Sequence, residues 1–241
     1  MLYTTDAIVL HSVKYSDNSL IVTMLTRRFG RLAYIFRKAK TMKSGNRAAF
    51  LQPLNLVEVT VYNNPKKTIQ NLKEIRIAKF YNNIFQSAEK TAIALFVAEI
   101  VNKSLRQTEK DERLFDFIEN SLIFLDKTEK HFANYHLLFL MKMTKFFGFE
   151  PSANYLNYNY FDLISGEFSD KIPQHEHFLK NNDVALFNSL IDKEFEQMSE
   201  ISFSRASRKT TLENLLDFYR IHIPDFPQIK SLEVLTDVFD Y

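Results

Sequence analysis

The sequence TDAIVLHSVKYSDNSLIVTMLTRRFGRLAYIFR, residues 5–37, contains three short runs rich in Val, Ile, Leu, Thr and aromatic residues. Turn-forming residues separate the runs, and residues of these types are enriched in β-strands. Two further runs of the same kind, at residues 54–62 and 68–80, follow directly. Five short strands so close together predict a small closed barrel, because closure removes the exposed strand edges. The spacing alone fits either an oligonucleotide-binding (OB) barrel or an SH3-like barrel.

From residue 81 onward the apolar residues recur at helical spacing, which predicts helices at 89–106, 111–127, 131–147, 183–198 and 208–222. The third helix should end at Gly148, and the spacing of Thr210 and Glu213 suggests a capping box for the last helix. The predicted fold class is therefore α+β: a five-stranded OB-fold barrel domain at residues 1–79, then a mostly helical domain at 80–241. Residues 151–182 form an irregular insert in this prediction.

The composition limits the compartment and the chemistry. The chain has no cysteine, so disulfides and thiolate zinc sites are impossible. The N-terminal residues lack the pattern of a signal peptide, and the most apolar long segment, residues 135–149, carries Lys142 and Lys145. We therefore expect a cytoplasmic protein with no membrane contact.

Charge is distributed unevenly along the chain. Residues 1–80 hold fourteen Lys or Arg and four Asp or Glu, a net charge of +10. Residues 81–241 hold seventeen Lys or Arg and twenty-five Asp or Glu, a net charge of −8. This asymmetry predicts that the first segment meets an anionic partner.

The basic charge concentrates in residues 18–57, a window that contains no acid. Nucleic-acid grooves need cations for phosphates and flat rings on which bases stack. The alternative is a solvated strand edge whose cations discourage aggregation, although eight like charges without an acid would repel one another. The cations of the window are Arg27, Arg28, Arg31, Arg37, Lys38, Lys40, Lys43 and Arg47.

The strand at residues 31–37 has two distinct faces. Tyr34 and Phe36 share one face, and Arg31, Ile35 and Arg37 share the other, because side chains alternate along a strand. One face must line the barrel. The sequence leaves open whether Tyr34 and Phe36 stack on bases or fill the barrel.

Residues 7–59 resemble the N-terminus of the RecO family of bacterial recombination mediators. The resemblance rests on the VLHS strand, the YSDNSLIV turn and strand, the T-x-x-x-G-R pattern that ends at Gly30 and Arg31, and LQP at residues 51–53. It continues through FLMKMTKFFGF at residues 139–149 and SLEVL at 231–235.

The resemblance implies an N-terminal OB domain, a helical remainder and a nucleoid-associated role in DNA repair and recombination. It implies binding to single- and double-stranded DNA and annealing of complementary strands. It also implies contact with single-stranded DNA-binding protein (SSB) and, together with RecR, help in loading RecA onto SSB-coated DNA.

The resemblance also assigns individual residues. Five of the implied DNA contacts lie where the family is also basic: Arg31, Arg37, Lys40, Lys43 and Arg47. Arg27, Arg28 and Lys38 are additional cations of this chain, and Tyr34 is a candidate stacking ring. Contact with the acidic, apolar-ended SSB tail would use Arg113, Lys142 and Lys145.

The chain departs from the family where many members carry a cysteine cluster for zinc. Here the insert has no cysteine, and Asp170, His175 and His177 are too few fixed ligands for a metal site. We expect aromatic packing to hold the segment, and we expect no cofactor and no metal.

An enzyme is not expected. The chain has four glycines and no phosphate-binding or nucleophile-elbow motif. A nuclease would need acids that hold Mg²⁺, and the loop acids Asp162, Glu167 and Asp170, with Asp6 and Asp17 near the first strand, are typical of turns. Two binding functions stay open as alternatives: an RNA-binding OB protein, and an adapter for acidic protein tails.

Overall fold

The computed structural model describes residues 1–37, 47–105, 110–153 and 158–239. The chain divides into two compact units, unit 1 at Met1–Lys127 and unit 2 at Thr128–Tyr241.

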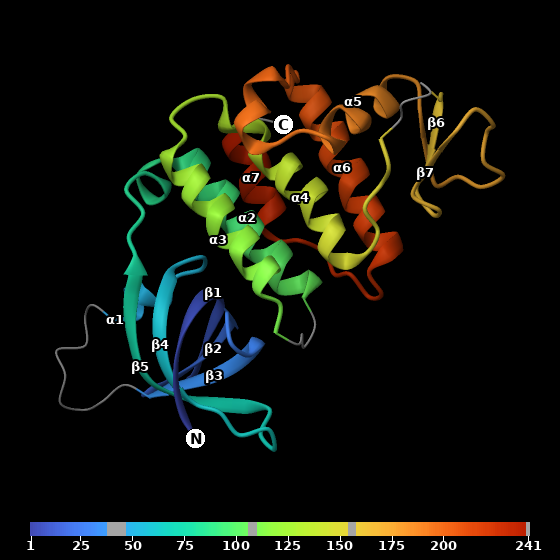
Figure 1. The fold of residues 1–241 in the computed structure, drawn as a ribbon. Helices are drawn as coiled ribbons and strands as arrows, with labels where there is room; N and C mark the ends of the chain where they lie inside the picture. The colour runs from blue at the N-terminus through green and yellow to red at the C-terminus, as the bar shows by residue number, and fades with distance from the viewer. Residues whose placement is uncertain (38–46, 106–109, 154–157, 240–241) are drawn as a thin grey trace. The chain divides into compact units, whose positions relative to one another are not determined.

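Unit 1 begins with a closed barrel of five strands in the order β1–β2–β3–β5–β4 (Figure 1). Neighbouring strands are antiparallel, except that β3 and β5 pair in parallel and close the barrel. This order confirms the OB fold over the SH3-like alternative, and the helical remainder confirms the α+β class. The strands are β1 (Leu2–Ser16), β2 (Ser19–Thr26), β3 (Gly30–Arg37), β4 (Leu56–Tyr62) and β5 (Ile69–Lys79), and the short helix α1 (Arg47–Phe50) lies between β3 and β4.

The T-x-x-x-G pattern is the tight turn between β2 and β3. The Thr26 hydroxyl donates a hydrogen bond to the Gly30 carbonyl at 3.0 Å and accepts one from the Phe29 N–H at 3.0 Å. Gly30 has φ of 65°, a conformation that costs glycine little. The backbone N–H of Arg27 bonds the Asp6 carbonyl at 2.9 Å. The pattern therefore fixes the turn that carries Arg27 and Arg28.

The burial of side chains in the barrel core shows which face of β3 points inward. Tyr34 and Phe36 are buried in the core cluster together with Val9, Val22 and Val59. The side chains at Ala33 and Ile35 take the outer face, since alternate residues of a strand point to opposite sides. Tyr34 and Phe36 therefore fill the barrel.

Two long helices complete unit 1: α2 (Ala88–Ser104) and α3 (Glu112–Lys127). The α3 carboxylate of Asp126 is buried and accepts backbone N–H bonds from Asn82 and Asn83 at 3.0 and 2.8 Å and from Ile84 at 2.9 Å. The Asp126 carbonyl accepts a bond from the Lys90 ammonium at 3.0 Å. This cluster fixes the segment that leads from the barrel into α2.

Unit 2 is built around α4 (Tyr135–Phe147), most of whose residues are buried. Gly148 ends α4 with φ of 78°, as predicted, and its N–H bonds the last helical turn. The remaining helices are α5 (Asn182–Ile191), α6 (Arg205–His222) and α7 (Ser231–Phe239). The Tyr219 hydroxyl of α6 donates to the Leu140 carbonyl at 2.8 Å, which joins α6 to α4.

The insert differs from the irregular segment that the sequence predicted. It contains a three-stranded antiparallel sheet of order β7–β6–β8, formed by β6 (Tyr160–Asp162), β7 (Glu167–Ser169) and β8 (Phe178–Lys180). Phe161 of β6 lies 4.7 Å from the Phe187 ring and 5.6 Å from the Phe218 ring, centroid to centroid. Aromatic packing thus joins the sheet to α5 and α6. Strands of three residues carry too little periodicity to be found in a sequence.

Two further helix predictions need correction, and one helix is not among the predictions. Helix α6 begins at Arg205 with Ser204 as its cap, so the proposed capping box of Thr210 and Glu213 is wrong. The predicted helix at 183–198 is α5 followed by a short 3₁₀ helix at 195–200. The helices predicted from the sequence do not include α7.

The described helices include none that is long and apolar enough to cross a membrane. Unit 1 extends past the predicted barrel segment to include α2 and α3, and the domain boundary between residues 79 and 80 stays a prediction.

The Asp126 cluster yields a stability prediction. Asp126→Asn replaces one acceptor oxygen with an N–H donor that faces backbone N–H groups, so we expect a loss of about 1–3 kcal/mol in the free energy of unfolding. Urea titration measures it. Asp170→Asn, at an exposed aspartate, is the control and should stay within about 0.5 kcal/mol of wild type. Equal stability of the two variants would contradict the assigned role.

Candidate nucleic-acid interface

One part of the outer surface of β1, β2, β3 and β5 contains no acid, although Asp6 of β1 and Glu74 of β5 are exposed elsewhere on these strands. Strand register places Val13 beside Ile21, Ile21 beside Ile35, and Ile35 beside Asn71. A parallel row joins His11 to Thr23, Thr23 to Ala33 and Ala33 to Ile69. Residues opposite one another on neighbouring strands share a face. The outer face is defined here as His11, Val13, Ser19, Ile21, Thr23, Ala33, Ile35, Arg37, Ile69 and Asn71.

The end of this face combines a cation with an exposed ring. Arg37 is exposed at the end of β3 and pairs in register with Ser19. Tyr15, near the end of β1, is 64% exposed. A cation and an exposed aromatic ring at the same end of a face are the combination that a single strand needs, since the ring stacks on a base and the cation meets the phosphate.

Ion pairing decides which barrel cations can meet an external anion. Each of the four acids in residues 1–80 has a partner within 4.0 Å: Asp6 with Arg27, Asp17 with Lys14, Glu58 with Arg76, and Glu74 with Lys73. In the part of the barrel that the structure describes, four exposed cations have no carboxylate partner. These unneutralised cations are Arg28, Arg37, Lys66 and Lys67.

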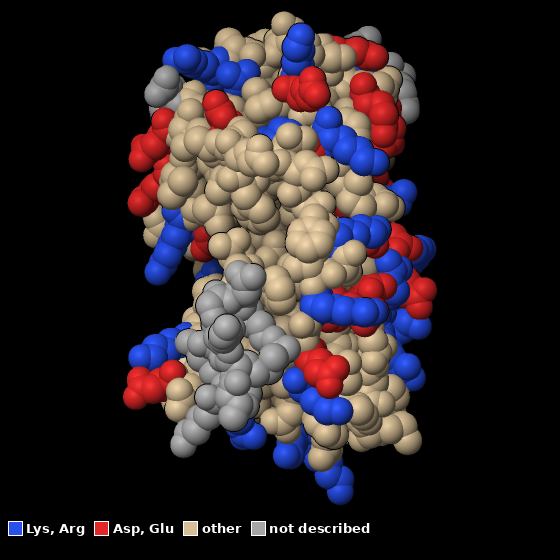
Figure 2. Space-filling model, turned by 90° about the vertical axis from the view of Figure 1, so that its left-hand side faces the viewer, with Lys and Arg blue, Asp and Glu red and all other residues tan. Residues whose placement is uncertain are grey.

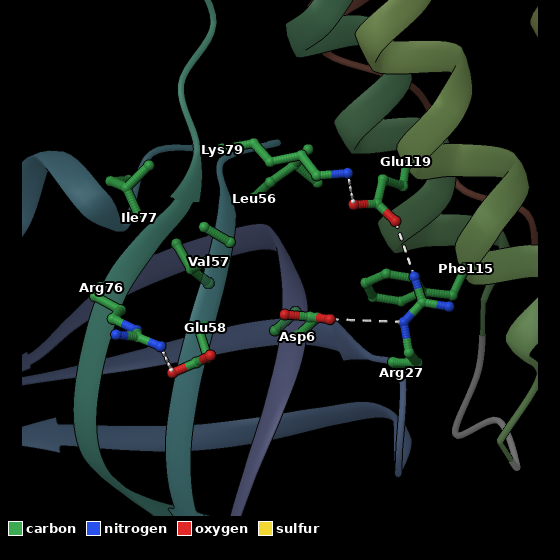
Figure 3. Close-up of a pocket in the computed structure, with 12 residues that line it drawn as sticks. Asp6, Arg27, Leu56, Val57, Glu58, Arg76, Ile77, Lys79, Phe115 and Glu119 are labelled. Carbon is green, nitrogen blue, oxygen red and sulfur yellow. Dashed lines mark hydrogen bonds and ion pairs between the residues drawn. The ribbon is translucent and has the colours of Figure 1, made fainter.

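Arg27 is neutralised most completely, in a pocket of about 530 Å³ between the barrel and α3 (Figure 3). Its guanidinium pairs with Glu119 at 2.8 Å, with Asp116, and with Asp6 at 3.8 Å. It also lies 4.3 Å above the Phe115 ring. Burial alone would lower the pKa of Arg27, but these carboxylates raise it instead.

The same pocket neutralises a second cation. Lys79 pairs with Glu119 at 2.8 Å, so one carboxylate serves both Lys79 and Arg27. The geometry of Arg27 therefore favours a structural link to α3 over the phosphate contact that the sequence proposed.

The other predicted DNA contacts that the structure describes also divide into cations with a protein partner and cations that are free to bind an external anion. The Arg31 guanidinium donates to the Asn102 side chain of α2 at 3.1 Å, and burial lowers its pKa. The Arg28 guanidinium lies 4.3 Å above the Tyr3 ring and stays exposed. Among the predicted contacts that the structure describes, Arg28 and Arg37 are therefore the two that are exposed and have no carboxylate partner, as binding to an external phosphate requires.

Tyr34 cannot act as the stacking ring that the sequence proposed. Its side chain is 0% exposed, and burial raises the pKa of its hydroxyl to about 12. The ring fills the barrel because it alternates with the outward residues of β3.

Part of the predicted basic loop lies outside the described residues. Lys38, Lys40 and Lys43 belong to that part, and for Arg47 the structure describes only its place at the start of α1. Their assignment as DNA contacts stays a prediction.

The residues proposed for the SSB tail belong to different units. Arg113 is exposed on α3 of unit 1. In unit 2, Lys142 pairs with Glu194 at 2.7 Å, and Lys145 is exposed on α4. This assignment also stays a prediction.

The acids considered for metal chemistry take part in local contacts. The Asp162 carboxylate accepts bonds from the Ile164 and Ser165 N–H groups and lies 3.1 Å from His175 Nε2. Burial would raise the pKa of Asp162, but these bonds hold it below its usual value. Within the described ranges, no three His, Asp or Glu side chains gather closely enough to hold a metal.

Figure 2 shows how the charges are arranged on one side of the molecule. Lys and Arg side chains stand at the lower end, which is the end with the N-terminus and the β4–β5 turn in Figure 1. The acidic groups of the lower part lie beside basic ones in this view. This arrangement agrees with the ion pairs of the barrel, whose four acids each lie within 4.0 Å of a basic partner.

The sequence analysis missed three exposed residues of the barrel: Tyr15, Lys66 and Lys67. Tyr15 follows His11 and Val13 at alternate positions, a pattern that marks an outward strand face. Lys66 and Lys67 follow Asn64 and Pro65, a turn signal that places charges at a tip. The strand alternation and the turn signal are both visible in the sequence. The three residues lie outside the acid-free window at residues 18–57, on which the prediction of DNA contacts is based.

Comparison with protein families matches the chain along most of its length. The family model described as "Recombination protein O N terminal" matches residues 1–81, and "Recombination protein O C terminal" matches residues 86–233.

Curated proteins give the same result. The chain is 35% identical over 241 residues to the DNA repair protein RecO of Azobacteroides pseudotrichonymphae, with 100% of both chains covered. It is 33% identical over 240 residues to the protein of that name from Phocaeicola vulgatus, and 34% over 241 residues to that of Flavobacterium psychrophilum. Each of these two alignments covers 99% of this chain and 100% of the relative.

The geometry of the two tyrosines yields a prediction. Tyr15→Ala removes an exposed ring, so single-stranded DNA affinity should fall by about 1–3 kcal/mol if a base stacks there. Tyr34→Phe keeps the buried ring and should leave that affinity unchanged. Fluorescence anisotropy with a labelled oligonucleotide measures both. A larger loss for Tyr34→Phe than for Tyr15→Ala would contradict the placement of the two faces.

Proposed function

The chain belongs to the RecO family of DNA repair proteins, and from that membership we propose that it binds single- and double-stranded DNA through its barrel and anneals complementary strands. Its role lies in DNA repair and recombination. With RecR it would help to load RecA onto DNA coated with SSB, in the bacterial cytoplasm at the nucleoid.

One observation carries the DNA-binding part of the proposal. The barrel has an outer face without acids, and each acid of the barrel is already paired with a cation. Among the residues that the structure describes, four exposed cations of the barrel therefore remain free to bind an external anion. Phosphates are the polyanion that such cations bind, with release of counterions. Arg37 also leads directly into the basic segment at residues 38–47. The phosphate path would thus continue from β3 into that segment.

Annealing requires no bond chemistry. Cations lower the repulsion between two phosphate backbones and so allow two strands to approach on one protein. The proposed mechanism is therefore charge screening and co-localisation, without a catalytic residue and without a cofactor.

Unit 2 is proposed to serve protein partners rather than DNA. It holds eleven Lys or Arg and seventeen Asp or Glu, a net charge of −6. Unit 1 holds twenty and twelve, a net charge of +8. The net negative charge of unit 2 repels phosphate, whereas the net positive charge of unit 1 attracts it.

The test combines Arg37→Ala with Lys40→Ala. Removing two phosphate contacts should weaken binding to single-stranded DNA of any sequence, and should flatten the plot of log affinity against log salt by roughly 0.7 per contact. Anisotropy titrations at several salt concentrations measure the slope. Unchanged affinity and slope would contradict the proposal.

A matched control removes two cations that already have partners. Arg76 pairs with Glu58 at 2.6 Å, and Lys79 pairs with Glu119 at 2.8 Å. Arg76→Ala with Lys79→Ala should leave the salt slope near the wild-type value. Parallel titrations with RNA of the same sequence test the RNA-binding alternative, and an acidic peptide as competitor tests the adapter alternative.

A further inference from the structure

The turn between β4 and β5 is held in place by one buried side chain. Gln70 is 2% exposed, and its Oε1 accepts the Asn64 N–H at 2.8 Å. Its Nε2 donates to the Asn64 carbonyl at 3.0 Å and to the Lys67 carbonyl at 2.6 Å. The Asn64 side chain accepts the Lys66 N–H at 3.0 Å. The backbone that carries Lys66 and Lys67 is therefore fixed before any ligand binds.

This turn presents charge that nothing nearby neutralises. Lys66 and Lys67 are exposed and have no carboxylate partner in the described part of the chain. Tyr62, at the end of β4, is 46% exposed. A preorganised loop with two lysines and a neighbouring exposed ring suits a phosphate backbone with its bases.

The first residues of the chain connect this turn to Arg28. The Asn63 N–H bonds the Met1 carbonyl at 3.1 Å, and the Tyr3 ring lies below the Arg28 guanidinium at 4.3 Å. The turn surface is defined here as Arg28, Tyr62, Lys66 and Lys67.

Strand register separates the turn surface from Arg37. In the parallel pair, Ala33 lies beside Ile69 and Phe36 lies beside Leu72. Arg28 and Lys67 precede the start of this pair, whereas Arg37 follows its end. At about 3.3 Å per residue, the nine residues from Arg28 to Arg37 span up to roughly 30 Å. The barrel therefore carries unneutralised cations at two separate ends.

We propose that the turn surface binds the phosphate backbone of a second nucleic-acid strand, while the Arg37 end of the barrel binds the first. This inference rests on the proposed function, because annealing must bring two strands to one protein. Two cationic ends on one rigid barrel would hold the strands close without forcing their phosphates into one groove. Gln70 would act as a positioning residue for Lys66 and Lys67.

The experiment compares the wild type with a double variant that carries both Lys66→Ala and Lys67→Ala. A first titration uses an oligothymidine too short to reach both ends of β3 and counts the oligonucleotides bound per chain. A second assay measures the annealing rate of two complementary oligonucleotides. The wild type should bind two short strands. The double variant should bind one and should anneal about tenfold more slowly, because it has lost two phosphate contacts that hold the second strand.

Two further variants serve as controls. Lys171→Ala with Lys180→Ala removes the same charge from exposed positions of unit 2 and should behave as wild type. Lys66→Arg with Lys67→Arg keeps the charge and should retain both readouts. Circular dichroism checks that each variant is folded.

Unchanged stoichiometry and annealing in the double variant would overturn the inference. Loss of all oligonucleotide binding would also overturn it, because the turn would then belong to a single site with Arg37. Wild-type protein that binds no DNA would instead contradict the proposed function itself. The two failures are thus distinguishable in one set of measurements.

Discussion

Closure of the barrel through the parallel pairing of β3 with β5 is the constraint on which the rest of the structure depends. Once β3 has neighbours on both sides, its alternate residues must point into the core or away from it. Tyr34 and Phe36 are committed to the interior, where Leu72 of β5 joins them. Arg37 is then committed to the exterior, and the outer face follows from the register alone.

Electrostatic pairing then divides the cations into two groups with different roles. Helix α3 supplies Asp116 and Glu119 to Arg27, and Glu119 also serves Lys79, so these cations link the barrel to a helix. Arg28 and Arg37, without a described carboxylate partner, keep their charge available to an external ligand. The net charge of a segment therefore overstates its capacity for phosphate, because partners distant in sequence cancel part of it.

The insert of unit 2 shows how a chain without cysteine can attach a small sheet. Phe161 packs against Phe187 and Phe218, and His222 Nε2 donates a hydrogen bond to the Leu163 carbonyl at 2.9 Å. Aromatic rings bury a large area each, so a few of them can secure strands of only three residues. The aromatic residues that are crowded together in this part of the sequence predicted the packing, but they did not predict the three short strands.

The sequence by itself determined the five strands, the barrel, the helical remainder and the basic character of the first eighty residues, because these depend on local periodicity and on composition. The T-x-x-x-G-R pattern likewise fixed the turn before β3. The tertiary structure alone decided that Tyr34 is internal, that Arg27 is neutralised, and that Lys66 and Lys67 stand on a turn held by Gln70. The first two outcomes depend on contacts between residues far apart in the chain, and the third depends on side-chain hydrogen bonds within a short turn. Periodicity carries no information about either kind of contact.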